Sequence, residues 1–284
     1  MKKSPNILNI MLTKTHFPMN SIKPISLAGL TSRLFAHRGI HGTYHQNDKK
    51  LPTYIPENTL ASFLLAIQQH LAIELDVQLT LDQQVVVFHD NNTKRLTQVS
   101  KKIKHSTLSE LQSLKILPHS TCLNQPFTKK MLFQIPTLSD TLKLIAGQTS
   151  LLIELKSAPM ANFRPLCQKT AQLLQQYKSQ NQTAFIAIKS FDPRIVQWFQ
   201  RFHPDIPAGL LISSHPKSLL ALGLLVLHFP LNTFLTPHFI SVDKKIVHKK
   251  IIQKYHQDHP VLCWTLSKNS TKPLKQFADN FIIE

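Results

Sequence analysis

Short apolar runs that end in polar side chains recur along this chain of 284 residues. The run AIELDVQLT at 72–80 alternates in polarity as a β-strand does, so Glu74 and Asp76 point to one face and the apolar residues between them to the other. Buried like charges are costly unless a cation neutralises them. This strand therefore predicts a metal site, with further ligands at the ends of other strands.

Three further runs carry polar residues at or near their carboxyl ends. This arrangement is typical of a parallel β-barrel whose active site lies at the carboxyl face of the strands. The runs are LFAHRG (34–39, ending in His37, Arg38 and Gly39), VVVFHD (85–90, with His89) and LLIELKS (151–157, with Glu154 and Lys156 on one face).

These motifs also follow the order found in a known family. From about Ser32 to Glu284 the chain resembles the glycerophosphodiester phosphodiesterases. The resemblance implies an α/β fold, a (β/α)8 TIM barrel with a small insertion over the catalytic face. It also implies a divalent cation and the release of an alcohol from glycerophosphodiesters. It rests on AHRG (36–39), IPENTLASFLLAI (55–67), AIELDVQLT (72–80), VVVFHDNNTKRLT (85–97), IPTL (135–138), LLIELKS (151–157), SFDP (190–193) and WTL (264–266).

Five positions carry over from this resemblance as the chemical centre. Glu74, Asp76 and Glu154 correspond to the metal ligands, and three carboxylates without a thiol suit Mg²⁺ or Ca²⁺ better than zinc. His37 and His89 correspond to the catalytic acid–base pair, since imidazole titrates near neutral pH. Which histidine is the acid stays open, as does the choice between direct attack by water and a cyclic phosphate.

Five more residues are expected around that centre. The resemblance implies that Arg38 and Lys156 contact the phosphate, and that Glu57 supports Arg38 or the metal. Lys156 also suits a salt bridge to the neighbouring carboxylates. Phe191 and Trp264 end later strands, where they form either an apolar wall for the glycerol or head group, or ordinary barrel packing.

The chain is long enough for one barrel domain, expected at 32–284, with an insertion at about 91–136 and a loose extension at 1–31. The apolar stretch at 217–235 is interpreted as a buried helix and loop, with a membrane-facing patch as the alternative. The eight strands are assigned to AHRG, IELDV, VVFHD, IELK, IKSF, GLLI, FISVD and LCWTL, which leaves the final FIIE without a place.

Two turns lack the glycine that relatives usually have. His70 or Leu71 precedes the IELDV run, and Gln83 or Gln84 precedes VVVFHD. We expect these turns either to hold a non-glycine residue at positive φ or to change shape. Nearby, Asn58 is predicted as the N-cap of the following helix.

Composition and net charge say less about the function than the motifs do. The formal net charge is +18, which fits either a solvated basic surface or attraction to anionic substrates or an anionic membrane. No nucleic-acid-binding motif is present, so no nucleic-acid partner is expected. Three widely spaced cysteines suggest reduced thiols and the cytoplasm, with export as the weaker alternative. His41, in the loop after His37, has no family counterpart and is expected to be an ordinary loop residue.

The sequence thus predicts metal-dependent hydrolysis of small glycerophosphodiesters to glycerol 3-phosphate and an alcohol. One alternative is a lysophospholipase D or sphingomyelinase D type enzyme acting at membranes. Another is a catalytically silent barrel that binds anionic lipid or nucleic acid. The complete set of two histidines and three carboxylates argues against silence.

Overall fold

The computed structural model describes residues 25–44, 53–116, 132–157, 161–215 and 236–284. The apolar stretch at 217–235, Cys122 and residues 1–24 lie outside these ranges, so the expectations about them are not addressed. Among the described residues, no helix combines the length and the apolar character needed to cross a membrane.

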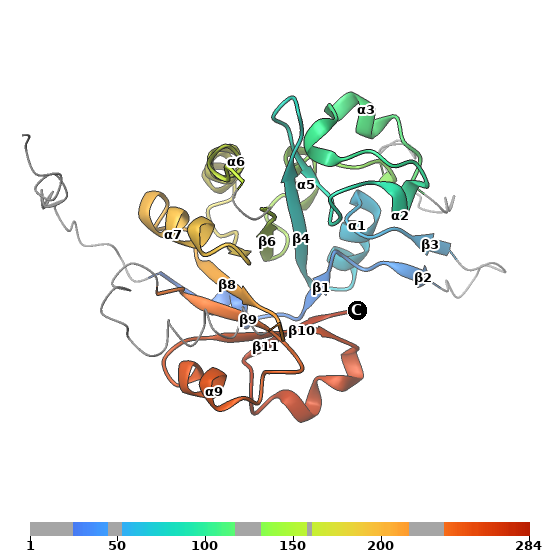
Figure 1. The fold of residues 1–284 in the computed structure, drawn as a ribbon. Helices are drawn as coiled ribbons and strands as arrows, with labels where there is room; N and C mark the ends of the chain where they lie inside the picture. Colours follow the sequence, from blue (N-terminus) through green and yellow to red (C-terminus); the bar gives the residue numbers. More distant parts are fainter. Residues whose placement is uncertain (1–24, 45–52, 117–131, 158–160, 216–235) are drawn as a thin grey trace, which may run out of the picture.

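A closed barrel of parallel strands dominates the fold (Figure 1), as the sequence predicts. Strand β1 pairs with both β4 and β11, which joins the two ends of the row β1-β11-β10-β9-β8-β7-β6-β4 into a ring. The strands are β1 (Phe35–His37), β2 (Gly42–Tyr44), β3 (Thr53–Ile55), β4 (Ala72–Leu79), β5 (Val85–Val87), β6 (Leu151–Leu155), β7 (Ile186–Ser190), β8 (Ala208–Ile212), β9 (Phe239–Asp243), β10 (Val261–Leu266) and β11 (Asn280–Ile283).

One strand assignment made from the sequence is wrong. The VVVFHD run is not a stave of the barrel, because β5 folds back on β4 in antiparallel pairing, with Val87 opposite Val77. The turn that joins them is too short for the crossover of about a dozen residues that parallel pairing requires. Strand β11, which contains Phe281–Ile283 of the unplaced FIIE run, closes the ring instead.

Helices cover the outside of the ring, joined by a few short 3-10 turns. The cap of α1 differs from the prediction: Thr59 forms a capping box with Ser62, and Asn58 lies one residue earlier. The α-helices are α1 (Leu60–Gln68), α2 (Lys94–Thr97), α3 (Leu108–Gln112), α5 (Leu138–Ile145), α6 (Arg164–Gln180), α7 (Pro193–Phe202) and α9 (Lys250–His256), and the 3-10 turns are η2 (Ala28–Leu30), η3 (Ile103–His105), η4 (Lys268–Ser270) and η5 (Lys272–Leu274).

The interior of the barrel is apolar at the amino ends of the strands. Residues i and i+2 of a strand share a face, so a strand residue of this apolar layer points to the same side as the residue two positions further on. In six strands that later residue is polar or aromatic: His37, Glu74, Glu154, Lys189, Ser241 and Trp264. Leu30, within the segment expected to be loose, is fully buried in this cluster, so packing against the barrel begins before residue 32. The apolar layer consists of Leu30, Phe35, Ala72, Leu152, Ala187, Phe239, Leu262 and Ile282.

The segment expected to be an insertion shares a small apolar cluster with β5 and the residue that follows it, built around Phe88, Ile103 and Leu111. It includes η3 together with α2 and α3, and these two helices lie on the same side of the barrel as β4 (Figure 1). Residues 117–131 of the expected insertion fall outside the described ranges.

The two glycine-poor turns keep their shape with non-glycine residues at positive φ. His70 has φ 56° and Gln83 has φ 57°. The left-handed conformation costs an ordinary residue roughly 1–2 kcal/mol, and glycine adopts it without that cost.

We therefore expect His70→Gly and Gln83→Gly each to raise the free energy of unfolding by about 0.5–1 kcal/mol, after the greater chain entropy of glycine in the unfolded state is subtracted. Urea unfolding followed by circular dichroism measures this change. Gln69→Gly is the matched control, since Gln69 has φ −93° and should lose stability. Loss of stability in all three variants would contradict this account of the turns.

Candidate active site

Three carboxylates meet at the carboxyl end of the barrel. Glu74 and Asp76 project from β4 and Glu154 from β6, where Asp76 and Glu154 are register partners. One oxygen from each lies within 4.8 Å of the others, and all three residues are buried. The structure thus brings together the three positions that the sequence predicted as metal ligands.

Two lysines lie among these carboxylates. Lys156 Nζ is 2.7 Å from Glu154 Oε1 and 3.1 Å from Asp76 Oδ1. Lys189 Nζ, from β7, is 2.9 Å from Glu74 Oε1, and its residue is only 2% exposed. The sequence analysis missed Lys189, although IAIKS places a lysine on an apolar strand just as IELK does.

The pKa values of Asp76 and Glu154 are shifted in opposite directions. Burial by itself would raise the pKa of Asp76, but Lys156, His89 and Arg38 together hold that pKa well below its usual range. Burial, reinforced by the charge of Asp76, raises the pKa of Glu154 instead. The folded protein therefore stabilises the charge of Glu154 less than that of Asp76, and a bound cation would favour the ionised form of Glu154.

A left-handed turn after β1 presents Arg38. Arg38 and Gly39 both have positive φ, 56° and 76°. The Arg38 amide donates to Glu74 Oε2 at 3.1 Å, and its guanidinium is 2.8 Å from Glu57 Oε1 and 3.5 Å from Asp76 Oδ2. A Cβ at Gly39 would come within 2.7 Å of the Ser62 backbone, so only glycine lets this turn pass against α1.

Asn58 has a different role from the predicted helix cap. Its side-chain amide donates to Asp76 Oδ2 at 2.9 Å, and its residue is 2% exposed at φ 53°. The PEN motif thus supplies two contacts to the site, because Glu57 holds Arg38 while Asn58 holds Asp76.

A chain of ion pairs leads from Glu57 to His89. Arg95, from α2, makes two hydrogen bonds to Glu57, at 2.7 and 2.8 Å, and its Nε lies 2.6 Å from Asp90 Oδ2. Asp90 Oδ1 is in turn 2.7 Å from His89 Nδ1. The Gln78 amide donates to the carbonyls of Phe88 and Asp90 at 2.8 and 2.9 Å, which anchors the loop that carries His89. None of Arg95, Asp90 and Gln78 was identified from the sequence.

His37 is also oriented by a carboxylate. Its Nδ1 lies 2.8 Å from Oε1 of Glu284, which follows β11. The hydrogen bond from His37 lowers the pKa of Glu284. The sequence analysis assigned no role to Glu284, because it found no place in the barrel for the FIIE run that ends in this residue.

Both histidines open into one hollow of about 240 Å³ at the centre of the barrel mouth. Phe191 and Trp264 form one wall, with their rings edge to face at a centroid distance of 6.3 Å. Phe191 is 47% exposed, so barrel packing alone does not account for its position. The other predicted residues that line the hollow are Arg38, Asp76, Glu154 and Lys156, whereas Glu74 and Glu57 are not among its lining residues.

The carboxylate cluster fits a hard divalent cation. It offers only oxygen ligands, which Mg²⁺ and Ca²⁺ prefer. The three carboxylates, Lys156, Lys189 and Arg38, together with the linked Glu57, Arg95 and Asp90, have one formal negative charge in excess. A divalent cation would turn this excess into one positive charge, which matches the single negative charge of a phosphodiester.

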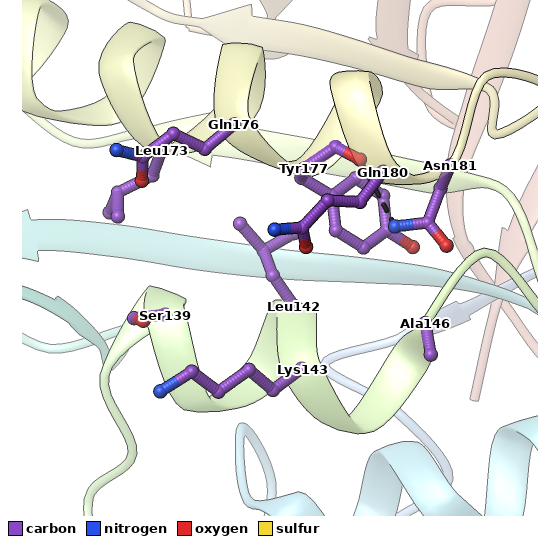
Figure 2. A pocket seen from close by; sticks show the side chains of 9 residues that line it. All are labelled: Ser139, Leu142, Lys143, Ala146, Leu173, Gln176, Tyr177, Gln180 and Asn181. Carbon is purple, nitrogen blue, oxygen red and sulfur yellow. Dashed lines mark hydrogen bonds between the residues drawn. The ribbon is translucent and has the colours of Figure 1, made fainter.

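A second hollow, of about 350 Å³, lies on the outside of the barrel between α5 and α6 (Figure 2). Leu142 and Lys143 point toward it from α5, and Gln176 and Gln180 from α6. It contains no carboxylate, imidazole or thiol among its lining residues, so it offers no comparable chemistry.

The sequence of this chain is similar to those of known proteins. The profile of the glycerophosphoryl diester phosphodiesterase family matches residues 37–279. The protein YhdW of Bacillus subtilis is 36% identical over 179 residues, which cover 63% of this chain and 65% of that protein. A glycerophosphodiester phosphodiesterase of Bacillus altitudinis is 26% identical over 183 residues, covering 63% and 66%. The matches thus span slightly less than two thirds of these relatives.

A solved structure has the same fold. A phosphodiesterase of Oleispira antarctica, in complex with the product sn-glycerol 3-phosphate, superposes with a TM-score of 0.66 at 23% identity. The superposition covers 88% of this chain and 92% of that one. At this identity the match establishes the barrel alone.

Proposed function

Because this chain belongs to the glycerophosphoryl diester phosphodiesterase family, we propose that it hydrolyses glycerophosphodiesters to glycerol 3-phosphate and an alcohol. The observation that carries this proposal is that His37 and His89 line one hollow together with Asp76 and Glu154, two members of the carboxylate cluster. Phosphodiester cleavage needs a general base, a general acid and positive charge beside the phosphate, and this hollow contains all three.

Glu74, Asp76 and Glu154 would hold the divalent cation, Mg²⁺ or Ca²⁺. When bound, such an ion withdraws negative charge from a phosphate oxygen as that charge develops. Lys156 and Arg38 add fixed positive charge. Burial alone would lower the pKa of Lys156, but Asp76 and Glu154 raise it, so its ammonium group stays charged at any physiological pH.

His37 and His89 would act as the acid–base pair. Each imidazole has its Nδ1 next to a carboxylate, Glu284 or Asp90, which leaves Nε2 free to exchange a proton with the substrate. These carboxylates orient the two rings. Phe191 and Trp264 would pack against the glycerol or the head group of the diester.

Lysophospholipase D activity is the second candidate. Lysophospholipase D GDPD1 of Rattus norvegicus is 32% identical over 174 residues, which cover 59% of this chain and 50% of that protein. The net charge of +18 would favour contact with an anionic membrane, where such substrates reside.

Turnover of three substrates separates the two candidates. With Mg²⁺ or Ca²⁺, we expect glycerophosphocholine and glycerophosphoethanolamine to be cleaved faster than lysophosphatidylcholine, because the hollow of about 240 Å³ suits a small polar diester better than an acyl chain. Glycerol 3-phosphate release, coupled to its dehydrogenase, measures the first two rates, and choline release measures the third. A faster rate with lysophosphatidylcholine would favour the membrane enzyme.

A further inference from the structure

A second group of metal-ligating side chains lies beside the proposed catalytic pair. His37, His41 and Glu284 each offer one ligand atom, and these three atoms lie within 4.8 Å of one another. Parallel pairing of β1 with β11 brings Glu284 next to His37. His41 reaches the same place from the turn that follows Gly39.

His41 is the member of this group that no other role explains. Its Nε2 is buried and has no hydrogen-bond partner among the described residues. A buried polar atom without a partner costs about 1–3 kcal/mol, so such atoms call for an explanation.

The chemistry of this group differs from that of the carboxylate cluster. Two imidazole nitrogens and one carboxylate oxygen form a ligand set typical of zinc and related transition metals, whereas three carboxylates suit Mg²⁺ or Ca²⁺. The Glu284 side chain is 54% exposed, so an ion from solvent can reach the group. The tetrahedral arrangement would be completed by water, since the three residues leave one position open.

We propose that His37, His41 and Glu284 form a second metal site that binds Zn²⁺ or a similar transition-metal ion, and that its occupation inhibits the enzyme. The inhibitory part rests on the proposed function, because it requires that His37 exchanges a proton with the substrate. A metal that takes His37 and Glu284 as ligands would prevent this exchange and break the contact between the two side chains. The binding part depends only on the geometry of the three side chains.

Calorimetric titration of Zn²⁺ into the whole protein, with Mg²⁺ in large excess, tests the binding part. We expect His41→Ala and His41→Gln each to weaken one zinc site by at least about 10–100-fold, since loss of a ligand should cost no less than loss of a supporting contact. His105→Ala is the matched control, because His105 is an exposed histidine outside this group. Equal zinc affinity in wild type and both His41 variants would overturn the proposal.

Inhibition is measured on the same proteins. Zn²⁺ should inhibit glycerophosphodiester turnover by the wild type and the His105→Ala variant, and the His41 variants should keep their basal rate yet need at least about ten times more Zn²⁺ for half inhibition. Unchanged inhibition in the His41 variants would place the inhibitory ion elsewhere and overturn the inhibitory part. If the wild type cleaves no diester, the proposed function fails, and calorimetry alone decides whether the site exists.

Discussion

Replacing Asp76 with Asn should abolish turnover. Asp76 is a predicted ligand of the cation, and Lys156, Arg38 and Asn58 all contact its carboxylate and stabilise its ionised form. Metal stabilisation of a phosphoryl oxygen contributes several kcal/mol, and each 1.36 kcal/mol is tenfold in rate, so a loss of at least about 10³-fold in kcat is expected. The coupled assay for glycerol 3-phosphate measures this loss.

Asp76→Asn also leaves Lys156 short of one partner, so its folding must be checked by circular dichroism. Glu154→Gln provides a second variant, because the raised pKa of Glu154 means that a neutral side chain there disturbs the fold less. Asp205→Asn is the control, since Asp205 is exposed and pairs with Lys178, and neither residue belongs to the candidate site. A folded Asp76→Asn protein with a near-native rate would remove Asp76 from the proposed mechanism.

Loss of either histidine should be nearly as damaging. His37→Ala and His89→Ala are each expected to lower kcat by roughly 10²–10⁴, the range for a general acid or base, while metal binding persists. The two changes should not add fully, because both groups act in the same reaction.

The matched measurements are kcat under saturating substrate and calorimetric binding of Ca²⁺ for the two variants and for His105→Ala. Only the control should keep the wild-type rate, and all three should keep the calcium affinity. Near-native rates in both active-site variants would show that the acid–base assignment is wrong.

Much of the fold could be predicted because strand alternation determines which side chains share a face. Glu74 and Asp76 were placed on one face in this way, and their cluster with Glu154 is found in the barrel. Alternation does not determine the neighbour of a strand, however. VVV has the same pattern in parallel and antiparallel pairing, so only the short turn before Val85 could have indicated the hairpin.

Most of the site residues that the sequence analysis missed were missed for the same physical reason. Asn58, Arg95 and Glu284 reach the site through pairings between distant segments, and nothing local to each residue signals them. Lys189 is different, because a charged residue on the apolar run IAIKS is a local signal. Its position beside Glu74 also changes the electrostatic argument, since lysines as well as a metal ion neutralise the clustered carboxylates.

The central claim is that a divalent cation enables this site to release glycerol 3-phosphate. ³¹P NMR of glycerophosphocholine mixed with the chelated, metal-free protein, before and after addition of Ca²⁺ or Mg²⁺, tests it most directly. The account predicts no change in the diester resonance until the cation is added, and then its replacement by the monoester resonance of sn-glycerol 3-phosphate. Hydrolysis that proceeds equally in excess chelator, or that yields phosphocholine instead, would contradict it.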